Sequence, residues 1–207
     1  QTAIWQAMLA SAGLPFSKQV FIHGFITVDG KKISKSLGNT INPIEVAKKY
    51  GTDALRYYLL AKINPYDDSD FTFKQFEETY NGELANGLGN LVARTAKLCE
   101  NSGFDFNDLN HWSIDKNIEN ALREYRFDEA LKIIWEKVTE NDKYINEHEP
   151  WKLTGAKLKE VLTFTVSSLR SITYCLEPFL PETAEKIEKQ FKGPKIIAGA
   201  SLFPRLK

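Results

Sequence analysis

Three lysines and two serines lie close together in residues 29–39, which read DGKKISKSLGN. An ammonium on a flexible stem suits contact with a phosphate group that moves, and a serine hydroxyl can donate to a phosphate oxygen. Donors held in place around a pyrophosphate leaving group stabilise the charge that develops on it. Short basic runs are also common in exposed turns. On charge content alone, an exposed turn is the more common explanation for this segment. The choice between such a turn and a phosphate-binding loop therefore depends on the surrounding sequence.

A second group of polar residues follows helical spacing. Asn86, Asn90 and Arg94 recur every four residues, on the face opposite an apolar stripe. Amide and guanidinium groups on one exposed ridge can hydrogen-bond the edges of unstacked bases. An ordinary solvated helix face has the same pattern, and the spacing alone favours that alternative.

Trp151 lies in the run NEHEPWKL, where Pro150 begins a new segment. A tryptophan at such a junction more often fills a core than binds a ligand. The functional alternative is a platform for a nucleic-acid base, because stacking on an aromatic ring contributes about 1–3 kcal/mol per base.

The elements that must position these residues change in type along the chain. The run QVFIHGFITV predicts one strand or two short ones within residues 19–28. Asn42, Pro43 and Gly51 bound a predicted helix, and a second one follows with Thr52 or Asp53 as its cap. From about residue 76 the strong patterns are helical. We therefore expect a mainly α protein: the end of an α/β domain, a small helical connection and an antiparallel helix bundle.

Three apolar stripes support the helical part. They step at three and four residues, as one face of a helix does. Their members are Leu84, Leu88, Leu91, Val92, Thr95 and Leu98; Phe127, Ala130, Leu131, Ile134, Trp135 and Val138; and Leu158, Val161, Leu162, Thr165, Leu169, Ile172 and Leu176.

The composition narrows the class further. With 27 basic and 27 acidic residues in 207, the net charge is zero, which argues against a nucleic-acid coat but not against a protein that reads a few bases. No apolar run approaches the length of a membrane span.

Cys99 and Cys175 are far apart and have no CxxC context, so neither zinc nor a disulfide framework is expected, and free thiols fit the cytoplasm. The chain starts without Met inside a predicted helix, so we expect a fragment of a longer protein.

The order of the motifs resembles the methionyl-tRNA synthetases, a family of class I aminoacyl-tRNA synthetases. HGFITVDGKKISKSLGNTINP followed by YGTDALRYYLL is similar to the segment around that family's KMSKS loop, and the similarity extends to the tail LFPRL. The loop here is residues 32–36, with Ile33 as the apolar anchor in place of the commoner methionine.

The resemblance implies roles for individual residues. Lys35 would stabilise the transition state in which methionine and ATP, with its Mg2+, give methionyl-adenylate and pyrophosphate. The loop residues Lys32, Ile33, Ser34 and Ser36 would bind ATP with it. The methionyl group would then pass to tRNA(Met), whose anticodon the family reads with an Asn and an Arg four residues apart and a stacking Trp. These match Asn90, Arg94 and Trp151. No metal site is expected within this chain.

The same resemblance implies three domains. Residues 1–27 would be the end of a Rossmann-type catalytic domain, 28–82 the connective domain that carries the loop, and 83–207 the helical anticodon-binding domain. The family's other ATP motif, a HIGH-like histidine pair, is not found in the chain, so the isolated chain is expected to be inactive and cytoplasmic, with no membrane partner. Two alternatives stay open: a non-catalytic tRNA-binding module, and the equivalent part of a leucyl enzyme. Asn90, Arg94 and Trp151 together argue against the leucyl enzyme.

Overall fold

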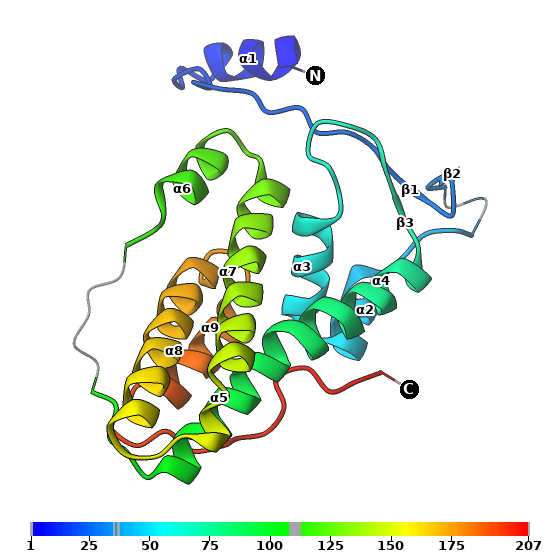
Figure 1. Ribbon diagram of the computed structural model, residues 1–207. Coiled ribbons are helices and arrows are strands. Elements are labelled where there is room, and N and C mark those ends of the chain that lie inside the picture. Colours follow the sequence, from blue (N-terminus) through cyan, green and yellow to red (C-terminus); the bar gives the residue numbers. More distant parts are fainter. Residues whose placement is uncertain (1, 35, 37, 108–112, 207) are drawn as a thin grey trace.

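The described part of the protein is mainly helical, with one small sheet (Figure 1). The computed structural model describes residues 2–34, 36, 38–107 and 113–206. The α-helices are α1 (Thr2–Ser11), α2 (Pro43–Tyr50), α3 (Thr52–Ala61), α4 (Phe73–Thr79), α5 (Asn90–Ser102), α6 (Lys116–Arg123), α7 (Phe127–His148), α8 (Gly155–Leu176) and α9 (Pro181–Phe191). A π-helical segment, η1 (Tyr80–Gly89), and a 3-10 turn, η2 (Pro150–Lys152), complete the helical elements.

The sheet holds the lysine-rich segment. Strands β1 (Ile26–Val28), β2 (Lys31–Lys32) and β3 (Ser69–Phe71) lie in the order β2-β1-β3. β1 pairs antiparallel with β2 and parallel with β3. Asp29 and Gly30 join β1 to β2 with φ angles of 51° and 71°. A two-residue turn with both φ angles positive matches the twist of a hairpin, and Asp-Gly is a favoured pair for it.

The predicted strand over residues 19–28 is much shorter than expected. Only Ile26–Val28 pairs as a strand, while Val20, Ile22 and Phe25 stay exposed. Gly24 instead packs closely against residues 64–68. Its amide donates to the Pro65 carbonyl, and a Cβ on Gly24 would lie 2.1 Å from the Asp67 carbonyl oxygen. A strand needs a paired neighbour for its backbone groups, and this stretch has such a neighbour only at its end.

The boundaries of α2 are those that the sequence predicts. The Asn42 side chain accepts from the Ile44 amide, Pro43 is the first residue, and Gly51 follows the last. The expected cap of the next helix is wrong, because Gly51 occupies the cap position of α3 and provides no side-chain bond. Asp53 is buried instead, and its carboxylate accepts from the Thr183 amide (2.6 Å) at the start of α9.

The first apolar stripe, which runs from Leu84 to Leu98, does not form a single α-helix. Residues 80–89 wind as the π-helix η1 and continue directly into α5. Leu84, Leu88, Leu91 and Val92 are nevertheless buried as predicted. A Cβ on Gly89 would lie 2.9 Å from the Leu84 carbonyl oxygen, so the close turn of η1 at this point depends on glycine.

The long helices pack into one core. α7 packs against α6 and α8, α8 against α5 and α9, and α3 against α7, which joins the sheet region to the helical part. The carboxyl-terminal tail returns to η1, where Phe203 packs edge-on against Tyr80 and Asn81 bonds the Leu206 amide (2.9 Å). Within the described ranges, no helix combines the length and the apolar character that crossing a membrane requires.

Candidate functional sites

The lysine-rich hairpin is held at its turn by one carboxylate. Asp70 Oδ1 accepts from the Thr27 hydroxyl (2.6 Å) and from the Gly30 amide (2.9 Å). These bonds favour the charged form and hold the pKa of Asp70 below its usual value, with the Thr27 hydroxyl as the larger cause. Asp70 lies within β3, and the polar run around it gave no sequence signal for this role.

The far end of the loop is closed by Asn39. Its Oδ1 accepts from the Ser34 amide (2.9 Å) and its Nδ2 donates to the Lys32 carbonyl (3.1 Å). The hydroxyls of Ser34 and Ser36 lie 2.8 Å apart. The sequence interpretation did not single out Asn39. An asparagine directly after a glycine in a turn is the signal that could have found it, because asparagine side chains bond nearby backbone groups in turns.

The predicted ATP-binding residues differ in what the structure describes of them. Lys32 and Ser36 are exposed, and Ser34 is half-buried. Ile33 is 41% exposed, so it is not a core anchor in this conformation. Lys35, the predicted catalytic residue, lies outside the described residues.

The three predicted anticodon residues come from two separate elements. Asn90 is the first residue of α5 and is exposed, as is Asn86 within η1. Arg94 follows one turn later on α5, and its guanidinium carbon lies 5.1 Å from the centre of the Trp151 ring. Trp151 is therefore brought to the same surface as Arg94, although the two are far apart in the sequence.

Trp151 is an exposed ring on a fixed backbone. α7 ends where Glu149 turns left-handed (φ 43°), and the buried Pro150 opens η2. The Trp151 residue keeps 51% of its surface exposed. A tryptophan that fills a core would be covered, so the core alternative for Trp151 is wrong.

Two further polar residues join this surface. Asp142 on α7 accepts from Arg94 Nη1 through Oδ1 (3.1 Å) and from Asn146 Nδ2 through Oδ2 (3.1 Å). The sequence patterns did not single out Asp142 or Asn146, since charged and amide side chains on a solvated helix face are common.

Nearby cations are paired with acids. Lys97 Nζ lies 2.6 Å from Glu100, and Lys152 Nζ lies 2.7 Å from Glu149. These two carboxylates therefore balance the positive charge of Lys97 and Lys152.

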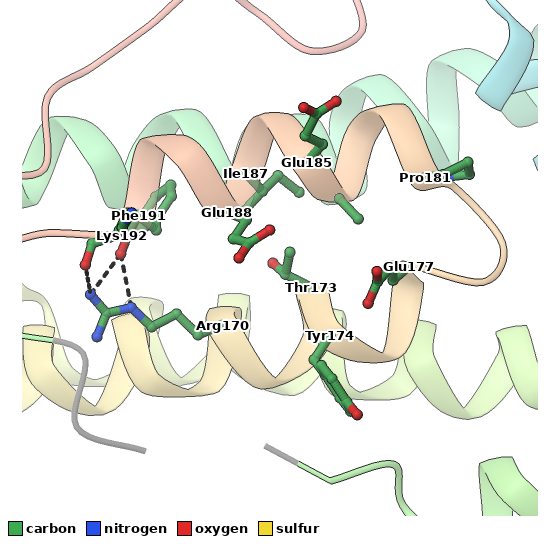
Figure 2. A pocket seen from close by; sticks show the side chains of 11 residues that line it. Arg170, Thr173, Tyr174, Glu177, Pro181, Glu185, Ile187, Glu188, Phe191 and Lys192 are labelled. Atoms are coloured by element: carbon green, nitrogen blue, oxygen red, sulfur yellow. Dashed lines mark hydrogen bonds between the residues drawn. The ribbon is translucent and has the colours of Figure 1, made fainter. Parts of the chain in front are cut away.

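A separate cavity of about 530 Å³ lies between α8 and α9 (Figure 2). Arg170 points across it and donates to the carbonyls of Phe191 (2.9 Å from Nε) and Lys192 (3.2 Å) at the end of α9. Glu177, Glu185 and Glu188 also line it. Arg170 therefore joins the two helices, and the acidic lining disfavours a nucleic-acid phosphate.

The two candidate sites lie on different sides of the molecule. The hairpin of β1 and β2 lies beyond α2 and α3, whereas the turn from α7 into α8 lies at the opposite end of the helical part (Figure 1). In the described part of the chain, no three His, Cys, Asp or Glu residues gather in a way that could hold a metal ion.

Two family models match consecutive parts of the chain. Residues 1–96, which contain the hairpin, Asn90 and Arg94, match the tRNA synthetases class I (M) family. Residues 113–207, which contain Trp151, match the anticodon-binding domain of tRNA ligases. The two matches place the chain among the class I tRNA synthetases.

Individual relatives narrow this class. The methionine–tRNA ligase of Clostridium acetobutylicum is 36% identical over 99% of this chain and 37% of its own length. That of Bacillus subtilis is 34% identical over 100% of this chain and 37% of its own. The chain belongs to the methionyl-tRNA synthetase family.

Solved structures show the same fold. The Mycobacterium tuberculosis methionyl-tRNA synthetase in complex with methionyl-adenylate has a TM-score of 0.81 and 26% identity, covering 98% of this chain and 47% of that one. Its free form has a TM-score of 0.80 and 22% identity, covering 99% and 47%. The chain thus spans less than half the length of these relatives.

Proposed function

We propose that this chain supplies the ATP loop and the anticodon-reading surface of a methionine–tRNA ligase. The full reaction activates methionine with ATP and transfers it to tRNA(Met). The observation that carries the proposal is the exposed Trp151 ring, with Arg94 over it and Asn90 one turn away, in a chain of this family.

The ATP loop would work through its lysines. Lys32 is exposed at the end of β2, and Asn39 and Asp70 restrain the backbone on either side of it. Lys32, Ile33, Ser34 and Ser36 would contact ATP, brought with its magnesium ion as substrate. Lys35 would place its charge on the developing pyrophosphate, an interaction that is strongest in the transition state.

The anticodon surface would read bases by two kinds of contact. The open part of the Trp151 ring would stack one base, and Asn90 and Arg94 would bond base edges. Support comes from the charge balance at this surface, since the paired lysines leave little free positive charge for phosphates.

The domain boundaries form part of the same proposal. Residues 1–27 would complete a Rossmann-type catalytic domain, 28–82 would carry the loop, and 83–207 would bind the anticodon. Support comes from the exposed apolar side chains of residues 4–25, such as Trp5, Ile22 and Phe25, which a catalytic domain would cover. The enzyme would act in the cytoplasm.

Methionine-dependent exchange of pyrophosphate into ATP, measured on the complete enzyme, tests the loop. Lys35→Ala should lower exchange at least about a hundredfold, the scale of one lost transition-state donor, and leave tRNA binding unchanged. Lys31→Ala removes the same charge from β2, four residues earlier, and should have a much smaller effect. Unchanged exchange in Lys35→Ala would show that the loop assignment is wrong.

A non-catalytic tRNA-binding module remains the second candidate for the isolated chain. Two observations favour it. All three proposed anticodon residues lie within this chain, and the chain spans only 37% of the length of the Clostridium acetobutylicum ligase. If the isolated chain binds tRNA and the complete gene product gives no methionine-dependent exchange, this second function is the correct one.

A further inference from the structure

One carboxylate joins the groups of the anticodon surface. Asp142 on α7 faces α5 and receives Arg94 Nη1 on one oxygen and Asn146 Nδ2 on the other. We propose that Asp142 is a positioning residue that sets anticodon specificity: it holds the Arg94 guanidinium against Trp151 and cancels its charge toward phosphates. This inference rests on the proposed anticodon function.

The positioning follows from where the three elements meet. Arg94 is a long side chain of α5 that could adopt many rotamers on an exposed face. Its ion pair with Asp142 on α7 and its contact with the Trp151 ring hold the guanidinium between these two elements. A guanidinium held over one part of the ring leaves the exposed part for a base, so stacking and edge contacts would be formed before RNA arrives.

The orientation of Asp142 is itself restrained. Asn146 lies one turn later on α7, and its amide holds the second oxygen of Asp142 (3.1 Å). The first oxygen therefore stays directed at Arg94. The side chains of Arg94 and Asp142 are 27% and 37% exposed, so water screens the pair only in part.

The charge of Asp142 has a second consequence. An arginine without a paired acid binds any nearby phosphate, which raises affinity for every RNA and carries no sequence information. With Asp142 in place, the contact of Arg94 with a base edge, where a bidentate hydrogen bond is possible, is more favourable than its contact with an RNA phosphate. The negative charge of Asp142 repels the phosphate. Asp142 would thus lower non-specific binding and sharpen discrimination.

The test is a titration of the chain with two RNA stem-loops, one with a CAU anticodon and one with a single anticodon base changed, at several salt concentrations. Asp142→Ala should reduce the ratio of the two affinities about fivefold and steepen the dependence of log affinity on log salt by about one unit. Asp142→Asn keeps an acceptor for Arg94 and loses only the charge, so it should reduce the ratio less than Asp142→Ala does while steepening the salt dependence by a similar amount.

Glu119→Ala is the matched control. It removes the acid from the exposed Arg123 pair on α6, away from the turn from α7 into α8 (Figure 1), and it should leave the affinity ratio unchanged. Thermal unfolding of each variant shows whether it is folded, and the indole NMR signal of Trp151, assigned with Trp151→Phe, reports the contact without RNA. That signal should shift in Asp142→Ala and stay in place in Glu119→Ala.

The outcomes separate the two proposals. If Trp151→Ala abolishes discrimination while Asp142→Ala keeps both the ratio and the salt dependence of the wild type, the role of Asp142 is refuted and the anticodon function stands. If the wild-type chain itself binds both stem-loops equally, the anticodon function fails, and the role of Asp142 fails with it.

Discussion

Single side chains fix the shape of the lysine-rich loop. Asp70 holds the Asp29-Gly30 turn and Asn39 holds the backbone of Lys32 and Ser34, so restraints lie on both sides of the predicted ATP-binding residues. Preformed loops lose less conformational entropy when they close on a ligand. The lysines would supply the charge, and these two residues would supply the geometry.

Asn39→Ala tests this restraint. The variant removes two side-chain hydrogen bonds, each contributing about 1 kcal/mol, so exchange of the Ser34 amide with solvent should accelerate about tenfold. The melting temperature should change little because the loop is exposed. Thr40→Ala, at the next exposed position, serves as control, and hydrogen exchange followed by NMR is the measurement. Equal exchange in Asn39→Ala and wild type would contradict the restraint.

The sequence predicted some of these residues and not others, for physical reasons. The sequence predicts roles for Lys32, Ser34, Asn90, Arg94 and Trp151 because their types and order match a family, and these roles stay predictions. Asn39, Asp70 and Asp142 act through side-chain bonds that depend on how the chain folds. Nothing in residues 139–142 indicates that Asp142 will face a residue 48 positions away.

Among the elements, η1 departs most from the prediction. The apolar spacing predicted the buried side chains correctly, because residues on one face of a helix remain neighbours when the helix widens locally. It did not predict the π winding, which places Glu83 against α3, where it accepts from the Tyr57 hydroxyl and from Lys62 Nζ (2.6 Å). π-helical segments are uncommon and often occur near functional sites, and η1 leads directly into Asn90.

Gly89→Ala and Gly82→Ala probe η1 from two positions. A Cβ on Gly89 would meet the Leu84 carbonyl oxygen at 2.9 Å and the Phe203 ring at 3.8 Å, whereas a Cβ on Gly82 meets nothing within 4 Å. Urea unfolding should therefore show Gly89→Ala destabilised by about 1–3 kcal/mol and Gly82→Ala unchanged or stabilised by up to about 1 kcal/mol. Equal stability of the two variants would contradict the packing described for η1.

Across the whole molecule, α3 connects the loop region to the helical part. Arg56 donates to the carbonyls of Phe179 (2.7 Å) and Pro178 (2.9 Å), and Asp53 caps α9 through the Thr183 amide. Tyr57 stacks on Trp135 of α7, with ring centres 4.2 Å apart. The sequence pattern predicted Thr52 or Asp53 as a cap of α3 itself. The structure instead places Asp53 and Arg56 in contacts with residues 178–183, which the pattern did not indicate.

Asp53→Ala tests this connection. The variant leaves the Thr183 amide without its acceptor in a buried position, so the free energy of unfolding should fall by about 1–3 kcal/mol. Glu182→Ala, an exposed acid in the first turn of the same helix, should change it by no more than about 0.5 kcal/mol. Urea denaturation of both variants is the measurement. A loss of stability in Asp53→Ala no larger than that in Glu182→Ala would contradict the role of Asp53 as a cap of α9.

The most direct test of the central claim is the affinity of the wild-type chain for anticodon stem-loops. We predict that a CAU stem-loop binds about tenfold or more tightly than one with a single anticodon base changed, within the range that base stacking contributes. Trp151→Ala should bring the two affinities together. Equal binding of both stem-loops by the wild-type chain would show that this surface does not read the anticodon.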